Sequence, residues 1–204
     1  MQSTATLLAP VEFPKFSGVQ MYMKKVMASV AHYVVPLEYR PMVRDMVAKA
    51  GIPGDQDVWI TIDESRVEKG QKHRRGGAHV DGCYETMGWN DDTGGGWLNG
   101  VPGRMLTEAE HTRSYRNPNG GMLIASNYSA CQFWAGEVEG IAGQGGDCEH
   151  LRDQFDKLDS GMMLANQAYL TNSTCIHESL PLDRNYSRQL LRITLSEQFQ
   201  FPIQ

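Results

Sequence analysis

The chain has 204 residues, which is long enough to bury a hydrophobic core and is the usual size of one domain. Its 41% hydrophobic and 21% charged residues exclude a disordered protein. Its net charge of −5 argues against a broad electrostatic grip on nucleic acid and leaves only a local basic groove open. No apolar run reaches about 18 residues and no signal peptide is recognisable, so we expect an intracellular protein without a membrane span.

The N-terminal part is predicted to be irregular and then helical. Prolines break any helix over residues 1–17. Residues 18–34 carry apolar side chains at helical spacing, and a second helix is expected over 39–50, with Gly51 as its stop. Residues 18–50 are therefore predicted to form a helical support. The apolar positions of the first helix are Met21, Val26, Met27, Val30 and Val34.

The pattern changes at residue 56, where DVWITIDESRV is rich in the β-branched and aromatic residues of strands. Short strand-like runs then continue, separated by Gly, Pro, Asn and Asp. Two helices followed by many short strands predict an α+β, mainly β fold, in which N-terminal helices pack on one sheet of a β-sandwich or barrel. We expect a single domain over residues 1–204. The later runs are 76–81, 121–128, 130–135, 161–165, 168–177 and 188–195.

The stretch GGAHVDGCY, residues 76–84, places a histidine and an aspartate two positions apart. Side chains at i and i+2 lie on the same face of a strand, so His79 and Asp81 would point at one place. An imidazole and a carboxylate are two of the three ligands of the usual mononuclear ferrous site. Because chance also produces such pairs, the interpretation needs a third ligand.

Residues 88–120 form a long segment without a strand pattern, rich in Gly, Asn and Asp. A connection of that length inside a compact domain is usually functional or disordered. It begins a few residues after Asp81, so we predict that it folds over the His79/Asp81 pair as a lid. A surface insertion without a role is the alternative.

The C-terminal part supplies a distal histidine and an arginine. His177 ends the run AYLTNSTCIH, and Arg192 follows fifteen residues later inside a strand-like run, two positions before Thr194. An arginine inside an apolar strand needs a partner, because a buried unpaired charge is costly. The guanidinium fork suits a carboxylate, and the Thr194 hydroxyl could add a hydrogen bond. Arg188, on the same face of the strand, is the competing candidate.

An HxD pair, a distal histidine and then Arg-x-Thr, in this order, resemble the 2-oxoglutarate- and Fe(II)-dependent oxygenases. The resemblance covers roughly residues 56–198. It implies a double-stranded β-helix core, also called a jelly-roll or cupin-like fold, over those residues. It makes His79, Asp81 and His177 the catalytic residues and the ligands of Fe(II).

The same resemblance implies a cosubstrate and a reaction. It makes Arg192, helped by Thr194, the partner of the far carboxylate of 2-oxoglutarate, with Arg188 as the alternative. Tyr128 and Gln132 could hydrogen-bond this cosubstrate near the metal or be ordinary polar residues of the core and rim. The implied activity is oxidation of a C–H bond in a small molecule or protein side chain, with release of succinate and CO2. Ascorbate is a candidate reductant.

Other side chains are weaker candidates. Asp147, Cys148 and His150 form a rival metal site, but no fourth ligand is evident. The basic run HRR at 73–75 would attract an anionic substrate or form an exposed turn, and we favour the turn. Four aromatic residues would line a substrate pocket or belong to the core, namely Trp59, Tyr84, Trp89 and Trp97. The cysteines show no CxxC spacing and are expected to be free thiols: Cys83, Cys131, Cys148 and Cys175.

Two functions of other classes stay open for the same residues. The chain could be a non-catalytic structural or binding protein on a jelly-roll fold. It could also be a metal-dependent cupin enzyme that uses no 2-oxoglutarate, because only the arginine speaks for that cosubstrate. A nucleic-acid base remains open as a substrate, since a single-strand channel needs only local positive charge.

Overall fold

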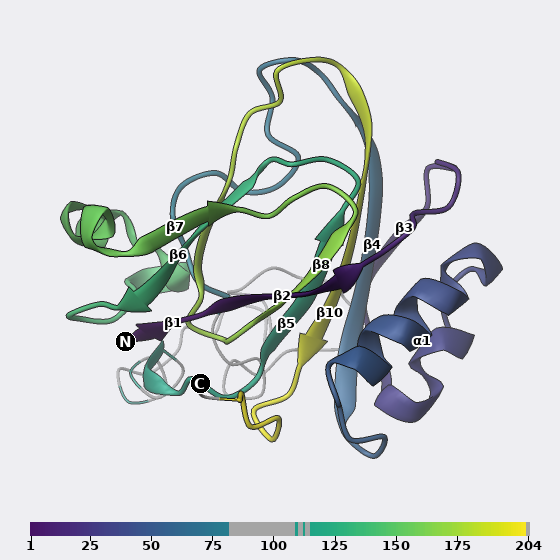
Figure 1. The fold of residues 1–204 in the computed structure, drawn as a ribbon, viewed down its shortest axis with the longest axis horizontal. Coiled ribbons are helices and arrows are strands. Elements are labelled where there is room, and N and C mark those ends of the chain that lie inside the picture. The colour runs from purple at the N-terminus through teal and green to yellow at the C-terminus, as the bar shows by residue number, and fades with distance from the viewer. Residues whose placement is uncertain (82–108, 110–111, 113–114, 203–204) are drawn as a thin grey trace.

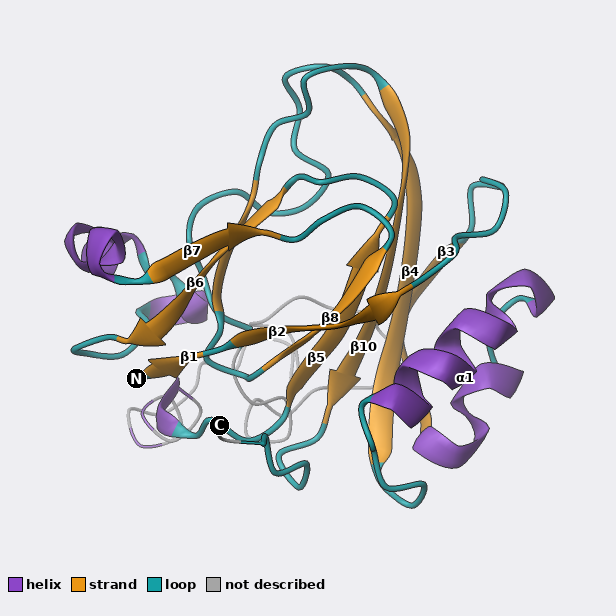
Figure 2. Cartoon of the chain, viewed as in Figure 1, coloured by secondary structure: helices purple, strands orange, loops and turns teal. Residues whose placement is uncertain are grey.

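The structure is a computed structural model, and it describes residues 1–81, 109, 112 and 115–202. Over these residues the chain is mainly β, with two antiparallel sheets and a group of helices beside one of them (Figure 1, Figure 2). The prediction of an α+β, mainly β chain is confirmed at this level. None of the helices in the described part combines the length and the apolar character that crossing a membrane requires.

Six strands form the larger sheet, in the spatial order β2-β8-β5-β10-β4-β3, and all neighbours are antiparallel. The central strand β10 pairs with β4 along its whole length, from Tyr186 opposite Val67 to Leu195 opposite Val58. The strands of this sheet are β2 (Ala5–Pro10), β3 (Gln20–Met27), β4 (Asp57–Val67), β5 (Gly121–Ser126), β8 (Gln167–Thr171) and β10 (Tyr186–Leu195).

The smaller sheet is built around β6, which pairs with β1, β7 and β9. The 3₁₀ helix η4 (Glu149–Lys157) packs against this sheet, where the rings of Trp134 and Phe155 lie 4.7 Å apart between centroids. The short 3₁₀ helix η3 (Gln144–Gly146) precedes it. The strands of the smaller sheet are β1 (Gln2–Ser3), β6 (Cys131–Glu137), β7 (Asp159–Met162) and β9 (Ile176–Ser179).

The helices η1 (Ala28–Tyr33), η2 (Leu37–Tyr39) and α1 (Arg40–Lys49) cover the face of the larger sheet that points away from the smaller sheet (Figure 1). The predicted helix over 39–50 is therefore confirmed. Its apolar side packs with alternate residues of β4 and β10, because successive strand side chains point to opposite faces. This core contains Met42, Val43 and Met46 of α1, Val58, Ile60 and Ile62 of β4, and Leu191, Ile193 and Leu195 of β10.

The predicted helix over 18–34 is wrong for its first half, which is the edge strand β3. The helical support begins at Ala28, with η1. A β-bulge between Met21 and Lys24 shifts the pairing register with β4. Met21 and Val26 therefore both contact the core although they are five residues apart. The bulge interrupts the alternation of a strand, and the resulting spacing of apolar residues resembles that of a helix.

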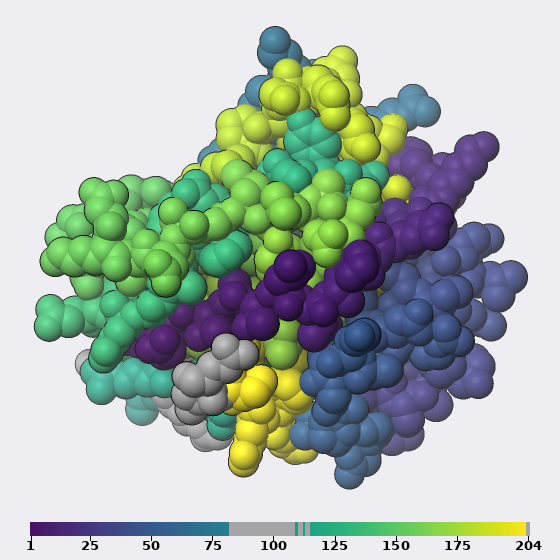
Figure 3. Space-filling view, viewed as in Figure 1, coloured from purple at the N-terminus to yellow at the C-terminus, as the bar shows by residue number. Residues whose placement is uncertain are grey.

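Three other predictions are wrong in their boundaries. Residues 1–17 were expected to be irregular but contain β1 and β2, and Figure 3 shows this segment stretched across the surface. Pro10 is the last residue of β2, an edge strand, where a missing N–H is tolerated. The run 168–177 is split into β8 and β9 by a turn. The run 76–81 is not a strand, and among the described residues its bridges are those of His79, to His177 of β9 and to Asp147.

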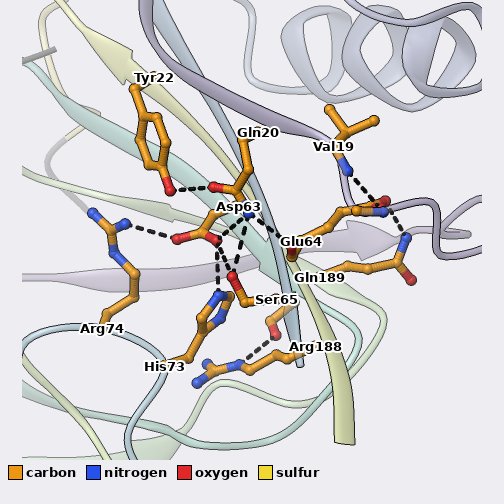
Figure 4. A network of polar contacts seen from close by, with 12 residues as sticks. Val19, Gln20, Tyr22, Asp63, Glu64, Ser65, His73, Arg74, Arg188 and Gln189 are labelled. Carbon is orange, nitrogen blue, oxygen red and sulfur yellow. Dashed lines mark hydrogen bonds and ion pairs between the residues drawn. The ribbon is translucent and has the colours of Figure 1, made fainter. Parts of the chain in front are cut away.

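Glu64 connects the N-terminal segment to the larger sheet. Glu64 and its neighbour Asp63 point to opposite faces of β4, as adjacent strand residues do (Figure 4). The Glu64 carboxylate accepts hydrogen bonds from the Tyr39 hydroxyl at 2.6 Å and the Gln189 amide at 2.8 Å. It also accepts the backbone N–H groups of residues 17–19, at 2.5 to 3.1 Å. Burial by itself raises the pKa of this carboxyl, but these hydrogen bonds outweigh burial and lower it to about 2.

We expect Glu64→Gln to lower the free energy of unfolding by about 2–4 kcal/mol at neutral pH, because the amide turns a donor toward groups that are themselves donors. The folded pKa of Glu64 lies below the ordinary value of 4.5, so its stabilisation is complete above that pH and is lost as the pH falls toward 2. Urea unfolding at several pH values measures the difference between the two proteins, which should shrink in acid. Glu68→Gln, at an exposed position, is the matched control. Equal stability of the Glu64→Gln variant and the unmodified protein at neutral pH would contradict the prediction.

Candidate metal centre

The predicted ligands His79, Asp81 and His177 are brought together by pairing between distant segments. The backbones of His79 and His177 exchange two hydrogen bonds, at 3.0 and 2.9 Å. One ligand atom from each of the three side chains lies within 4.8 Å of the others, and all three residues are buried. Among the residues that the structure describes, this is the one group with such geometry. It could hold a metal ion.

The His79 segment is held on both sides by backbone hydrogen bonds. On the side away from β9, the N–H of Val80 donates to the carbonyl of Gly146, and the N–H of Cys148 donates to the carbonyl of Ala78. The carboxylate of Glu149 accepts the N–H of Ala78 at 2.7 Å. These contacts fix the backbone that carries His79, so the imidazole is positioned before any ligand binds.

The orientation of each imidazole leaves one nitrogen for a metal. His79 Nδ1 lies 2.7 Å from the carbonyl of Gly77, and His177 Nδ1 lies 3.0 Å from the carbonyl of Cys175. A carbonyl oxygen only accepts hydrogen bonds, so each Nδ1 carries the proton. Each Nε2 then keeps its lone pair, which is the state of a metal-binding histidine oriented by a backbone carbonyl.

Asp81 offers one oxygen to the same place. Its Oδ1 forms an ion pair with Nη1 of Arg192 at 3.5 Å. Its Oδ2 lies 3.8 Å from Nε2 of His177 and accepts no hydrogen bond from any described residue. A buried carboxylate oxygen without a donor is costly in an apolar interior, and a cation would remove that cost. The side chains present therefore fit a metal ion.

The electrostatics of the group favour the protonation states that bind metals. Burial, reinforced by the neighbouring His177, lowers the pKa of His79 to about 4 even though Asp81 opposes the shift. Burial by itself raises the pKa of Asp81, but Arg192 and the two histidines outweigh it and lower that pKa. At neutral pH His79 is therefore neutral and Asp81 ionised, so neither must lose a proton when a metal binds.

The three side chains open into a cavity of about 830 Å3, including the part open to solvent. Much of its wall is apolar and comes from strands of both sheets, and the rest carries four arginines. The apolar wall includes Met122, Ile124, Cys131, Met163 and Leu190, and the arginines are Arg74, Arg75, Arg188 and Arg192.

The two arginines of β10 have different surroundings. Arg188 is 1% exposed, and its Nε donates to the Ser126 hydroxyl at 3.2 Å. Its Nη1 is buried and forms no hydrogen bond with a described residue, and burial lowers the pKa of this guanidinium. Arg192 instead forms the ion pair with Asp81. Arg188 is therefore the buried charge that lacks a carboxylate among the described residues.

Of the other predicted cosubstrate ligands, Tyr128, Thr194 and Gln132, only Tyr128 lines the cavity. The Tyr128 hydroxyl, however, donates to Asp183. Thr194 is buried with an unpartnered hydroxyl in the described part of the chain and does not line the cavity. Gln132 does not line it either, because its neighbour Cys131 does and adjacent strand residues point to opposite faces. Neither Thr194 nor Gln132 is brought to the metal centre.

The rival metal site at residues 147–150 is not assembled. The carboxylate of Asp147 accepts the N–H of Glu149, and Nε2 of His150 lies 3.1 Å from the carbonyl of Ile141. The thiol of Cys148 contacts the carbonyl of Gly146. The three described cysteines are free and buried, as predicted: Cys131, Cys148 and Cys175.

The basic run lies at the cavity, although sequence reasoning favoured an exposed turn for it over attraction of an anionic substrate. The predicted exposed turn at 73–75 is wrong for His73 and Arg74. The His73 side chain is 2% exposed and lies 3.0 Å from Asp63, which also pairs with Arg74 at 2.9 Å (Figure 4). Arg74 and Arg75 both line the cavity. A basic run immediately before the predicted ligand strand was the available signal.

Several predictions fall on undescribed parts of the chain. Most of the proposed lid over 88–120 lies outside the described residues, as do Cys83, Tyr84, Trp89 and Trp97. Trp59 is described; it packs against Met23 and does not line the cavity.

Comparison of the chain with protein-family models, with curated proteins and with solved structures finds no match in any of the three. The function is therefore inferred from the chain's own geometry. That geometry supplies a buried group of two imidazoles and one carboxylate, in a chain of two antiparallel sheets, that could bind a metal ion.

Proposed function

We propose that this chain is a 2-oxoglutarate- and Fe(II)-dependent oxygenase that oxidises a C–H bond of a small-molecule or side-chain substrate. The observation that carries the proposal is the buried His79–Asp81–His177 group with its two free Nε2 atoms and its unpartnered carboxylate oxygen. Two histidines and one carboxylate with open positions are the ligand set of non-haem ferrous oxygenases.

The order of the strands supports a jelly-roll core for this enzyme. From β4 onward, the described segments alternate between the two sheets. β4, β5, β8 and β10 lie in the larger sheet. The segments between them lie in the smaller sheet: first the one that carries His79, then β6 with β7, and then β9. The segment that carries His79 is bridged to β9. A chain that winds between two facing sheets in this way is what a double-stranded β-helix predicts. His177 of β9 and His79 of the bridged segment then lie side by side in the smaller sheet.

Bound iron, with 2-oxoglutarate and O2, supplies the oxidation: one oxygen atom enters succinate, the other enters the substrate, and CO2 leaves. His79, Asp81 and His177 would hold the metal. The carbonyls of Gly77 and Cys175 keep the protons of the imidazoles on Nδ1, away from it. The apolar wall excludes water from the space between the sheets.

We assign the far carboxylate of 2-oxoglutarate to Arg188 rather than to Arg192. Arg188 is the buried guanidinium with an unused donor, beside the Ser126 hydroxyl. A carboxylate placed there would gain charge-assisted hydrogen bonds in a site shielded from water. Arg192 already holds Oδ1 of Asp81, which keeps the other oxygen turned toward the two histidines. We therefore give Arg192 the role of positioning a metal ligand.

Anaerobic titration of the purified protein with Fe(II) and 2-oxoglutarate tests the proposal directly. We expect a weak visible charge-transfer band when both are present and no band with either alone, because the band requires the keto acid on the iron. Asp147→Asn, which changes a nearby carboxylate outside the group, should leave the band intact. A protein that takes up neither Fe(II) nor Mn(II) would overturn the proposal and favour a structural or binding protein on the same fold.

A further inference from the structure

We propose that Arg188, together with the hydroxyls of Ser126 and Ser179, forms a binding site for a small monoanion such as chloride in the cavity. Binding of the anion does not depend on the proposed function. Its consequence, competition between the anion and 2-oxoglutarate at Arg188, does rest on that function. The inference is carried by a buried charge without a counter-charge among the described residues, and by hydrogen-bond donors on the same cavity wall.

The charge of Arg188 is not balanced by the described residues around it. Burial lowers the pKa of its guanidinium, and Cys131 and Asp63 oppose that shift, but an arginine in a protein keeps its proton. Asp63 cannot serve as its partner, because both carboxylate oxygens are already used (Figure 4). Oδ2 pairs with Arg74, and Oδ1 contacts Gln20, Ser65 and His73, all at 2.9 to 3.1 Å.

The polar groups beside this guanidinium are donors. The Ser126 oxygen accepts from Nε of Arg188 at 3.2 Å and from the N–H of Tyr128 at 3.3 Å, so its own proton is left for a ligand. Ser179 is 6% exposed, and its hydroxyl contacts no polar group of the described residues. It lies two positions after His177 on β9, on the face that lines the cavity. Such a group of donors suits an anion.

Arg188 and Ser179 reach the same part of the cavity from the two sheets. Ser179 lies directly opposite Cys131 of β6, a pairing that brings Cβ atoms to about 4.5–5.5 Å. Cys131 packs in one apolar cluster with Leu190, which is two positions after Arg188 on β10. Burial raises the pKa of the Cys131 thiol to about 12, and the charge of Arg188 opposes this rise, so the two groups lie near each other. An anion there would meet donors from both sheets.

The surroundings select the kind of anion. One uncompensated positive charge calls for one negative charge. The wall beside it is apolar and contains Cys131, Met163 and Leu190. A strongly hydrated ion loses more than a weakly hydrated one on entering such a wall, whereas the attraction to the guanidinium is stronger away from water. We therefore expect chloride and bromide to bind better than fluoride.

Urea unfolding of the metal-free protein tests the site, in about 1 to 200 mM chloride made up to constant ionic strength with fluoride. An anion that binds only the folded chain raises the urea midpoint with the logarithm of its concentration. We expect this rise in the unmodified protein and none in Arg188→Met. In Ser179→Ala the rise should begin at about 5-fold more chloride, because one donor is lost. Two exposed matched controls should respond like the unmodified protein, Arg66→Met on β4 and Ser160→Ala on β7.

Two results would overturn the anion site. One is a midpoint of the unmodified protein that does not respond to chloride. The other is an equal rise in Arg188→Met, which would be a general effect of the salt. In fluoride alone Arg188→Met should be as stable as the unmodified protein, because it exchanges an unpaired buried charge for an apolar side chain. Loss of the chloride response in this variant would then not reflect a damaged fold.

Competition is tested on the anaerobic protein with Fe(II). Between about 5 and 200 mM chloride, we expect the 2-oxoglutarate concentration that gives half of the visible band to rise at least about 5-fold, and less in Ser179→Ala. Equal sensitivity of Ser179→Ala would indicate chloride on the iron and contradict competition at Arg188. If no band forms, the oxygenase function fails, while the unfolding experiment still decides the anion site. Chloride-dependent stability without competition would support the anion site and show that 2-oxoglutarate does not bind Arg188.

Discussion

Replacement of His79 or Asp81 by alanine is expected to abolish Fe(II) uptake and 2-oxoglutarate turnover while leaving a folded chain. Each substitution removes one of three donors whose atoms lie within 4.8 Å of one another. Loss of a residue that merely supports a metal ligand usually costs about 10–100-fold, so loss of a ligand should cost more than about 100-fold in turnover. Succinate formation, with ascorbate as the reductant, and metal content measure the effect.

The fold of these variants is checked separately by urea unfolding, which should remain cooperative. The core under the helices does not include the metal centre, so its packing is unaffected by either substitution. His150→Ala is the matched control, because His150 contacts a backbone carbonyl outside the group. Full turnover by His79→Ala in a folded protein would show that the iron assignment is wrong.

The second large effect is expected at Arg188, and it should separate function from stability. In Arg188→Met a buried charge without an ion-pair partner among the described residues is replaced by an apolar side chain. Such replacements are often neutral or stabilising, so the free energy of unfolding should not fall. The affinity for 2-oxoglutarate should fall by at least about 30-fold, which corresponds to roughly 2 kcal/mol for a buried charge-assisted contact. Band titrations and urea unfolding measure the two quantities.

Arg192→Met is the informative comparison on the same strand. It removes the partner of Asp81 Oδ1, so we expect weaker Fe(II) binding and a smaller change in 2-oxoglutarate affinity than in Arg188→Met. The reverse order, with Arg192→Met causing the larger loss of 2-oxoglutarate affinity, would return the cosubstrate to the arginine that the sequence motif alone favours.

The sequence by itself determined the features that depend on neighbouring residues. The alternation along β10 placed Leu191 and Ile193 on the core face and Arg188 and Arg192 on the other, because strand side chains alternate regardless of what they pack against. The helix over 39–50 was equally readable from its local stop signal, Gly51 followed by Pro53. The spacing of the HxD pair likewise indicated that His79 and Asp81 act together.

Other features depended on contacts between segments far apart in the chain. The strand β3 was mistaken for a helix because its bulge is defined only by pairing with β4. The choice between Arg188 and Arg192 depends on which guanidinium Asp81 reaches across the cavity. The position of Arg74 and Arg75 on the cavity wall also depends on contacts between distant segments, so the sequence did not reveal it.

The sequence thus determined local periodicity and the residue types of the metal centre. Only the tertiary structure decided which distant residues share it. The His79 backbone pairs with that of His177 across 98 positions, and Asp81 meets Arg192 across 111. Local conformational preference is set by a residue's own side chain and its nearest neighbours. Contacts over such separations depend on how both sheets pack as a whole, so they cannot be read from a short sequence motif.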